Sequence, residues 1–468
     1  MSGSQVKRNG LWGLVVRVAA VLLCLAASPP LARLAEAQNP TPQDTVPQDS
    51  ASQDTLRQDS IPQTDAPRDT TYSSWGDLDA TAGGFLVGRA KIGELSIGGY
   101  ALVRLLNQLA ADSFADHLGR EHPIHGRRDI QFHRAMVHFK GWLGSPKLRY
   151  QLTVWSLLST DQKVTYGFIG YQANRRFNVY GGINTLGGSR TMFGSHPFWL
   201  GHDRVMADEF FRPQFTGTIW INGELFPGFW YHGAVGDNLS ILGTTANEDN
   251  RQLGGGVSFW WMPTTHEFGP NGSFDDFEWH EKVATRFGAS YVRSREDRQT
   301  AIEKPTENTQ IRLADAVLIW DPGALADSAT VQRVTYQLLS ADAGMKYHGI
   351  FLQGHYFWRL LNDIDATSEI PVSKLIDNGF YLQAAFYPVK QKLELYGATS
   401  WVFGDKHAGF RNSYEFLGGM NFYPYYSRNQ RVNLQVIHVT RSPVSSLFGY
   451  YVGGQTGFII SVATSVYF

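Results

Sequence analysis

The run Arg431-Val432-Asn433-Leu434-Gln435-Val436 decides the fold class, because polar and apolar residues alternate in it without a break. Adjacent residues of a β-strand point to opposite faces of a sheet, so the run predicts a strand with one apolar and one polar face. The same alternation recurs from about residue 90 onward, for example in 176–184 and 229–236. The sequence therefore predicts an all-β protein made of many amphipathic strands.

Short and long connections alternate between these strands. Tight turns are indicated by composition at 144–146, 174–175, 226–228 and 388–390. Longer polar or glycine-rich stretches separate them, at 108–127, 185–213, 239–250, 296–330, 361–376, 404–412 and 442–451. This asymmetry is typical of a transmembrane antiparallel β-barrel, which has short periplasmic turns and long external loops.

Sixteen strands account for the pattern, and eighteen is the alternative. We place them at 91–106, 129–143, 148–157, 164–173, 176–184, 214–225, 229–238, 251–263, 283–295, 331–341, 345–358, 378–387, 391–403, 413–423, 431–441 and 455–468. Two places strain this count, because 264–282 is long for a periplasmic turn and Gln310–Trp320 is open to interpretation as a further strand. An even number of strands puts both termini on the periplasmic side.

The first 37 residues are predicted to be an export signal peptide. Lys7, Arg8 and Arg17 supply its positive region, Val18–Ala27 its apolar region, and Ala35-Glu36-Ala37 a small-x-small cleavage site. The single cysteine of the chain lies within the apolar region, so the mature protein has no disulfide framework.

Residues 38–82 form a low-complexity tail ahead of the barrel, which we place at 83–468. The tail holds eight acidic residues against Arg57 and Arg68 and has too few apolar groups to offset the entropy of ordering. We therefore expect a disordered acidic tail in the periplasm. A solvated spacer and a tether to a periplasmic or cell-wall partner are both open interpretations.

The composition and the motifs exclude several classes of protein. The chain of 468 residues is 18% charged with a net charge of −1, so it is neither disordered throughout nor a basic nucleic-acid binder. It has no GxSxG, HExxH, P-loop or paired-cysteine motif, so we expect no enzyme, catalytic residue, metal or cofactor. We interpret the histidines at 117, 122 and 125 as solvated loop residues, and the acids at 275, 276, 278 and 281 lack the pattern of a calcium loop.

The C-terminal segment carries a second signal. Its alternate residues share one apolar face and end on the terminal aromatic ring, in the series Phe458, Ile460, Val462, Thr464, Val466 and Phe468. A final strand of this kind looks like the recognition signal of the outer-membrane assembly machinery, with Phe468 as its key residue. Together with the export signal, it predicts the cell outer membrane, surrounded by lipid and lipopolysaccharide.

A closed sheet of sixteen strands is too wide for its own side chains to fill, so we expect an aqueous channel that a loop must narrow. The best candidate for this constriction is 185–213. Its titratable and charged residues are Arg190, His196, His202, Arg204, Asp208, Glu209 and Arg212, with Asp203 beside them. They are open to two interpretations, as lining of a narrow polarised gap or as salt bridges that pin the loop to the wall.

The alternation also assigns charges to the lumen. The basic residues are Arg134, Lys140, Arg149, Arg176, Arg286, Lys392 and Arg431, and the acidic ones are Glu94, Glu224, Glu394 and Glu415. Arginine and lysine rings attract anions, so this excess of bases predicts a mild anion preference. The alternative is that the basic and acidic side chains together produce a mixed electric field across the lumen, which selects little between anions and cations.

Four segments resemble the phosphate-selective porin O and P family of outer-membrane porins. Phe132–Gly141 looks like the family's Arg-rich second strand ending in Lys-Gly, and Gly181–Asn184 lies near where the family has a glycine-bearing strand before the constricting loop. Asp203–Pro213 and Gly223–His232 are similar to further segments of this group. The resemblance covers most of 85–468 and implies a sixteen-stranded, usually trimeric barrel through which small hydrophilic solutes diffuse. It does not imply phosphate, because the arginine ladder and lysine cluster of the selective members cannot be traced here.

Two functions follow from these observations. The first is a porin for small hydrophilic or anionic solutes, assembled as a homotrimer. The alternative is a structural outer-membrane barrel that is anchored through its N-terminal tail, with an incidental or closed pore.

Overall fold

The computed structural model describes residues 84–157, 162–194, 198–239, 252–298, 311–445 and 449–468. The predicted signal peptide and acidic tail lie outside the described residues. Within these ranges, no helix is both long and apolar enough to cross a membrane.

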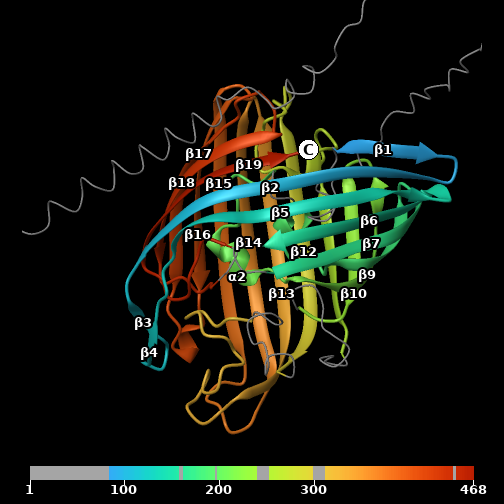
Figure 1. Ribbon diagram of the computed structural model, residues 1–468. Helices are drawn as coiled ribbons and strands as arrows, with labels where there is room; N and C mark the ends of the chain where they lie inside the picture. The colour runs from blue at the N-terminus through green and yellow to red at the C-terminus, as the bar shows by residue number, and fades with distance from the viewer. Residues whose placement is uncertain (1–83, 158–161, 195–197, 240–251, 299–310, 446–448) are drawn as a thin grey trace, which may run out of the picture. The chain divides into compact units, whose positions relative to one another are not determined.

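Sixteen antiparallel strands close into one barrel (Figure 1). They are β2 (Gly93–Ala110), β5 (Arg128–Leu143), β6 (Ser145–Leu157), β7 (Gln162–Asn174), β8 (Phe177–Thr185), β9 (Phe215–Phe226), β10 (Phe229–Gly236), β11 (Gly254–Trp261), β12 (Ala284–Asp297), β13 (Val331–Tyr347), β14 (Ile350–Ala366), β15 (Leu375–Val389), β16 (Leu393–Phe403), β17 (Ser413–Phe422), β18 (Gln430–Thr440) and β19 (Gly457–Tyr467). Each strand pairs with the next along the chain, and β19 closes the ring on β2, from Gly457 opposite Ala110 to Tyr467 opposite Tyr100. Closure leaves no open edge in the ring. The predicted sixteen-stranded barrel is confirmed.

The alternative of eighteen strands is wrong. The described part of the segment proposed as a further strand forms only an isolated bridge between Arg312 and Leu318. Three short strands do lie outside the ring: β1 (Phe85–Ala90), β3 (Ser113–Ala115) and β4 (Glu121–Pro123). β1 pairs with the first residues of β2, and β19 pairs with the later residues of β2 along the same edge. β1 therefore continues the line of β19 beyond the C-terminus.

The hairpin between β13 and β14 was expected too early in the chain, and β14 also runs to Ala366 where an end near 358 was expected. We expected β13 to end near residue 341, but it continues to Tyr347 and turns at His348 and Gly349. Both turn residues have positive φ, at 47° and 80°. Such a pair matches the right-handed twist of the strands that it joins, which fixes the hairpin at this point.

The connections at the two ends of the barrel differ in length, as predicted. At the end that carries the C-terminus, most turns are tight, for example the one at 348–349; we call this the short-turn end. The opposite, long-loop end carries most of the long connections, including 111–127, 298–330 and 441–456. The exception at the short-turn end is 262–283, the connection whose length strained the sequence analysis.

The apolar core lies inside the ring. Along β14, Leu352 and Tyr356 are exposed on the outer face, whereas Phe351 and Phe357 are fully buried on the inner face. Phe357 joins one cluster with side chains of the connections that fold inward, and Phe351 joins a second cluster of this kind. The ring therefore presents apolar side chains on both faces, outward to its surroundings and inward to its own connections.

Candidate functional site

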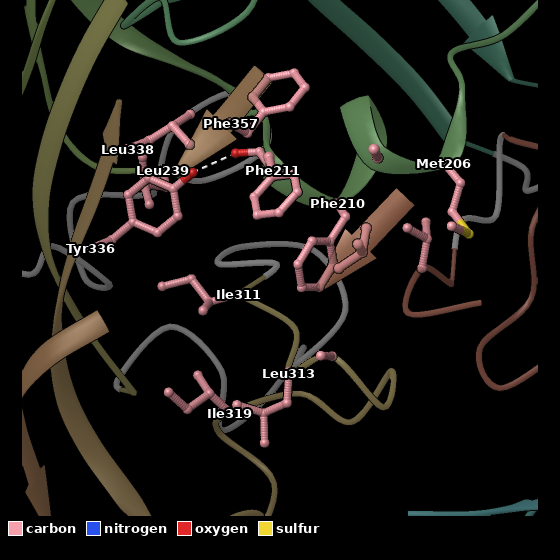
Figure 2. Packing of buried hydrophobic residues seen from close by; sticks show 14 of the residues in the cluster. Met206, Phe210, Phe211, Leu239, Ile311, Leu313, Ile319, Tyr336, Leu338 and Phe357 are labelled. Atoms are coloured by element: carbon pink, nitrogen blue, oxygen red, sulfur yellow. Dashed lines mark hydrogen bonds between the residues drawn. The ribbon is translucent and has the colours of Figure 1, made fainter. Parts of the chain in front are cut away.

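The connection between β8 and β9, residues 186–214, folds into the lumen and carries a short helix, α2 (Met206–Phe211) (Figure 1). The Phe211 ring stacks on Phe357 of β14 with centroids 5.2 Å apart, and the Tyr336 hydroxyl of β13 donates to the Phe211 carbonyl (Figure 2). The sequence placed a constricting loop at these residues. The connection occupies the lumen because its apolar residues complete the core that the wall begins.

The wall also caps the N-terminus of α2. Val205 at the N-cap offers no side-chain acceptor, so the first amide groups of the helix need partners from elsewhere. The Met206 amide donates to Glu415 of β17 at 2.7 Å, and the Ala207 amide donates to the Ser400 hydroxyl of β16 at 3.1 Å. Two wall side chains thus fix the position of the helix in the lumen.

Three wall arginines hold the tip of this connection. Arg104 of β2 and Arg134 of β5 bind the two carboxylate oxygens of Asp203 at 2.6 and 2.7 Å. Arg431 of β18 donates to the carbonyls of Trp199 and Gly201 and to Nδ1 of His202. All three guanidinium groups are almost fully buried, and Arg104 and Arg134 share the Asp203 carboxylate.

His202 lies among these arginines as a neutral side chain. Burial lowers its pKa well below the ordinary value, and the nearby positive charges of Arg431, Arg104 and Arg134 lower it further. Because Arg431 donates to Nδ1, the ring proton belongs on Nε2. The imidazole therefore acts as a hydrogen-bond acceptor for the wall and not as a cation.

The charges on and near α2 are paired within the connection itself. Asp208 accepts from the hydroxyls of Ser189 and Thr191 and lies 3.4 Å from Arg204. Burial raises the pKa of Asp208, and Arg204 and the two hydroxyl groups only partly offset that rise. Arg212 and Glu209 form a two-bonded pair at 2.8 and 2.9 Å. The paired geometry favours the interpretation of these residues as loop-stabilising groups in the conformation described.

Arg190 links the 186–214 connection to the connection 262–283 at the short-turn end. The residue lies in η4 (Arg190–Phe193) and donates to Gln353 of β14 and to the carbonyls of Gly272 and Ser273, at 3.1 and 2.9 Å. Its guanidinium stacks on Phe274, 4.1 Å from the ring centroid. Burial lowers the pKa of Arg190 to about 9, with Arg286 adding to the effect.

Two long-loop connections also enter the lumen. Figure 2 shows Ile311, Leu313 and Ile319 of one of them in the same apolar cluster as Phe210 of α2. From the other, Tyr451 donates to Glu415 at 2.6 Å. The described lumen is therefore filled by several connections that contact one another and the wall.

The other predicted lumen bases lie in different settings. Arg286 is buried on β12, with Nη2 3.3 Å from Asp342, and Lys140 and Arg149 are half-buried on β5 and β6. Arg176 and Lys392 lie just before β8 and β16, in turns, because β8 begins one residue and β16 two residues later than expected. Arg176 is exposed there, so its assignment to the lumen wall is wrong.

The predicted lumen acids all have polar partners. Glu94 pairs with Arg89 of β1 and Glu224 with Arg175. Glu394 accepts from Asn421 at 2.7 Å, and Glu415 accepts from the hydroxyls of Ser400 and Tyr451. The terminal Phe468 exchanges two backbone hydrogen bonds with Gly99 of β2. His196 lies outside the described residues.

Four basic residues that contact the 186–214 and 262–283 connections were not singled out from the sequence: Arg104, Lys346, Arg359 and Arg428. Arg104 lies between Leu102 and Leu106 on the same strand face. A charged residue within this apolar series was the signal that could have identified it. Lys346 was placed at the start of the following strand, 345–358, whereas it lies near the end of β13.

The acidic cluster at 275–281 forms ion pairs and not a cation site. Asp275 and Glu278 bind Arg428, and Asp276 binds His280. Over the described ranges, no three residues of the metal-binding types are grouped to hold an ion. In the long-loop connection 111–127, His117 pairs with Asp315 at 2.7 Å and His122 with Asp116 at 3.0 Å.

Comparison with known proteins supports the fold. No family model matches the chain, and no curated protein matches it. Among solved structures, the outer-membrane expressed OmpT of Vibrio cholerae superposes with a TM-score of 0.51 at 10% identity, over 82% of this chain and 100% of that one. The trimer form of in-vitro folded OmpT gives 0.51 at 10% identity, over 81% and 100%. An anion-selective porin from Comamonas acidovorans gives 0.48 at 11% identity, over 80% and 100%.

At this level of identity, what is shared is the fold. The chain has the closed antiparallel β-barrel fold of outer-membrane proteins.

Proposed function

We propose that the protein is a porin of the cell outer membrane through which small hydrophilic solutes cross passively. The observation that carries this proposal is the closed ring of sixteen strands with a charged connection, 186–214, folded across its lumen. A ring of this size encloses more space than its own side chains fill. The short-turn end then faces the periplasm and the long-loop end the exterior.

A mild anion preference is the finer part of the proposal. Arg104, Arg134 and Arg431 project from the wall toward a loop tip whose one carboxylate in these contacts is Asp203. A surplus of buried guanidinium groups favours anions over cations in a water-poor passage. A homotrimer is part of the proposal too, and the trimer form of the Vibrio cholerae OmpT supports it.

A second candidate function has its own support. The lumen-facing residues Glu394, Asn421 and Asn433 are fully buried, so the conformation described is closed at this part of the wall. A structural barrel that is anchored by its N-terminal tail needs no open pore. For the porin, the same burial means that inward connections must move before solutes pass.

Planar-bilayer conductance of the refolded mature protein tests the two functions. Discrete current steps, with a reversal potential on the anion side in a salt gradient, are expected for the porin. Current steps with a cation preference would support the porin function and refute the proposed anion preference. Absence of steps from heat-modifiable barrels would favour the anchor. Removal of residues 38–82 would then be expected to weaken the cell envelope.

A further inference from the structure

The connection 262–283 differs from every other described connection at the short-turn end. The longest of the others is 423–429, whereas this one runs between Trp261 of β11 and Ala284 of β12 and contains the short helix η6 (Pro270–Gly272). Phe268, Phe274 and Phe277 are all buried. A turn that only reversed the chain needs none of these residues, so the segment has a role beyond joining two strands.

Acidic residues fasten this connection to the barrel. Arg428, in the turn between β17 and β18, binds both oxygens of Asp275 at 2.5 and 2.6 Å and contacts Glu278 at 3.0 Å. The Tyr387 hydroxyl of β15 donates to Asp275 at 2.9 Å. The Gly349 amide, between β13 and β14, donates to Asp276 at 2.7 Å. The attachment therefore spans six of the sixteen ring strands, from β13 to β18.

Lys346 of β13 holds the connection from inside the lumen. Its ammonium group is fully buried and donates to the Phe268 carbonyl at 2.6 Å and to the Ser273 hydroxyl at 2.7 Å. It also lies 4.6 Å from the centroid of the Phe268 ring. A lysine is rarely buried to this degree. Here the folded connection supplies its hydrogen-bond acceptors, so burial of Lys346 depends on the connection.

The connection meets the 186–214 connection inside the barrel. The Phe274 amide donates to the Phe198 carbonyl at 2.8 Å, and Arg190 donates to the carbonyls of Gly272 and Ser273. One segment enters from each end of the barrel, and the two touch. Movement of the 186–214 connection alone therefore leaves the short-turn end filled.

We propose that residues 262–283 are a plug that closes the channel at its periplasmic end and that conduction requires its release from Arg428 and Lys346. The inference rests on the proposed porin function and adds the element that regulates it. The two ends of the plug lie close together, because the Thr285 amide donates to the Thr264 hydroxyl at 2.9 Å. Its removal leaves the paired parts of β11 and β12 intact.

The first test shortens the plug. Residues 267–281 are replaced by a short glycine-serine bridge, and folding is checked by heat-modifiable migration in detergent gels. Planar-bilayer recordings are expected to show current steps several-fold larger than those of the natural chain. Liposomes with the variant are expected to admit larger uncharged sugars. Steps and size limits equal to those of the natural chain would overturn the plug.

The second test loosens the plug without removing it. The double variant Asp275→Asn, Glu278→Gln keeps the shape of both side chains and removes their charges, so Arg428 loses both ionic partners. More frequent opening is expected, to the step size of the shortened variant. The matched control is Arg175→Gln, which breaks an ion pair with Glu224 at the same end of the barrel and is expected to leave conductance unchanged. Equal opening in the natural chain, the double variant and the control would contradict the proposal.

The two proposals fail in different ways. If the natural chain conducts and the shortened variant conducts identically, the plug is refuted and the porin stands. If neither conducts although both barrels are heat-modifiable, the porin and the plug are both refuted. If only the shortened variant conducts, the plug is supported as the element that holds the channel closed.

Discussion

The connections 186–214 and 262–283 are both held in the lumen by arginines, but these arginines lie in different parts of the wall. The tip of 186–214 brings backbone carbonyls and Asp203 to arginines on three strands of the ring. The segment 262–283 brings its own carboxylates to Arg428, which lies in a turn. Strands of a closed sheet move little, whereas turns are less constrained. We therefore infer that 262–283 leaves more readily than 186–214, once both Arg428 and Lys346 of β13 have released it.

The largest effect is expected when the shared carboxylate of 186–214 is removed. Asp203→Asn removes the carboxylate that binds the buried Arg104 and Arg134. Breaking a buried pair in this way costs about 3–5 kcal/mol of unfolding free energy. Urea unfolding in detergent micelles, followed by tryptophan fluorescence, measures the loss. A cost equal to that of Asp275→Asn would remove the distinction between a more firmly held and a more readily released connection.

The sequence predicted the ring well because its signal is local. Alternation within each strand and turn residues between strands placed all sixteen ring strands, with the largest boundary error at the end of β14, which runs to Ala366 where an end near 358 was expected. Which strand neighbours β19 across the closure was also predictable, since a barrel has no other way to remove its last edge.

The contents of the lumen were predicted less completely, because they depend on contacts between residues far apart in the chain. The composition of 185–213 indicated an inward loop, but nothing local to Asp203 indicates that Arg104 and Arg134 bind it. The length of 264–282 was visible as an anomaly, yet its partner Arg428 lies 153 residues beyond Asp275. Pairings of this kind follow from the closed ring and not from spacing in the sequence.

A smaller effect is expected from pH at the 262–283 connection. Burial alone lowers the pKa of His280, but hydrogen bonds to Asp276 and Glu267 outweigh it and raise that pKa to about 9. A raised pKa stabilises the folded state fully below the unfolded value near 6.5, and this contribution is lost as the pH rises through about 9. We expect the plug to loosen, and openings to become more frequent, as the pH rises from about 6.5 to about 9.

His280→Gln is the control for this pH dependence. At neutral pH it removes hydrogen bonds to charged groups worth about 1.5–3 kcal/mol, so openings should already be frequent. The increase at high pH should then disappear. An increase that persists in the variant would assign the pH dependence to another group.

The 186–214 connection is expected to respond to pH in the opposite direction. His202 is neutral when folded, since burial and three arginines hold its pKa well below 6.5. The unfolded chain binds a proton that the folded chain does not, so stability falls as the pH drops below about 6.5. The urea midpoint measured from pH 8 to 5 should decrease, and His202→Asn should flatten that decrease. A midpoint that is independent of pH in the natural chain would contradict the neutral assignment.

The smallest effect is expected at an ion pair that touches neither connection. Arg295 of β12 lies 2.8 Å from Asp365 of β14 near the long-loop end, and the Asp365 side chain is 55% exposed. Exposed pairs contribute about 0.2–1 kcal/mol, because water screens the charges and both side chains lose conformational freedom. Asp365→Asn should therefore shift the urea midpoint only slightly and leave conductance unchanged. A loss as large as that of Asp203→Asn would mean that the stability of the barrel depends on its rim, and the contrast between the two inward connections would lose its energetic basis.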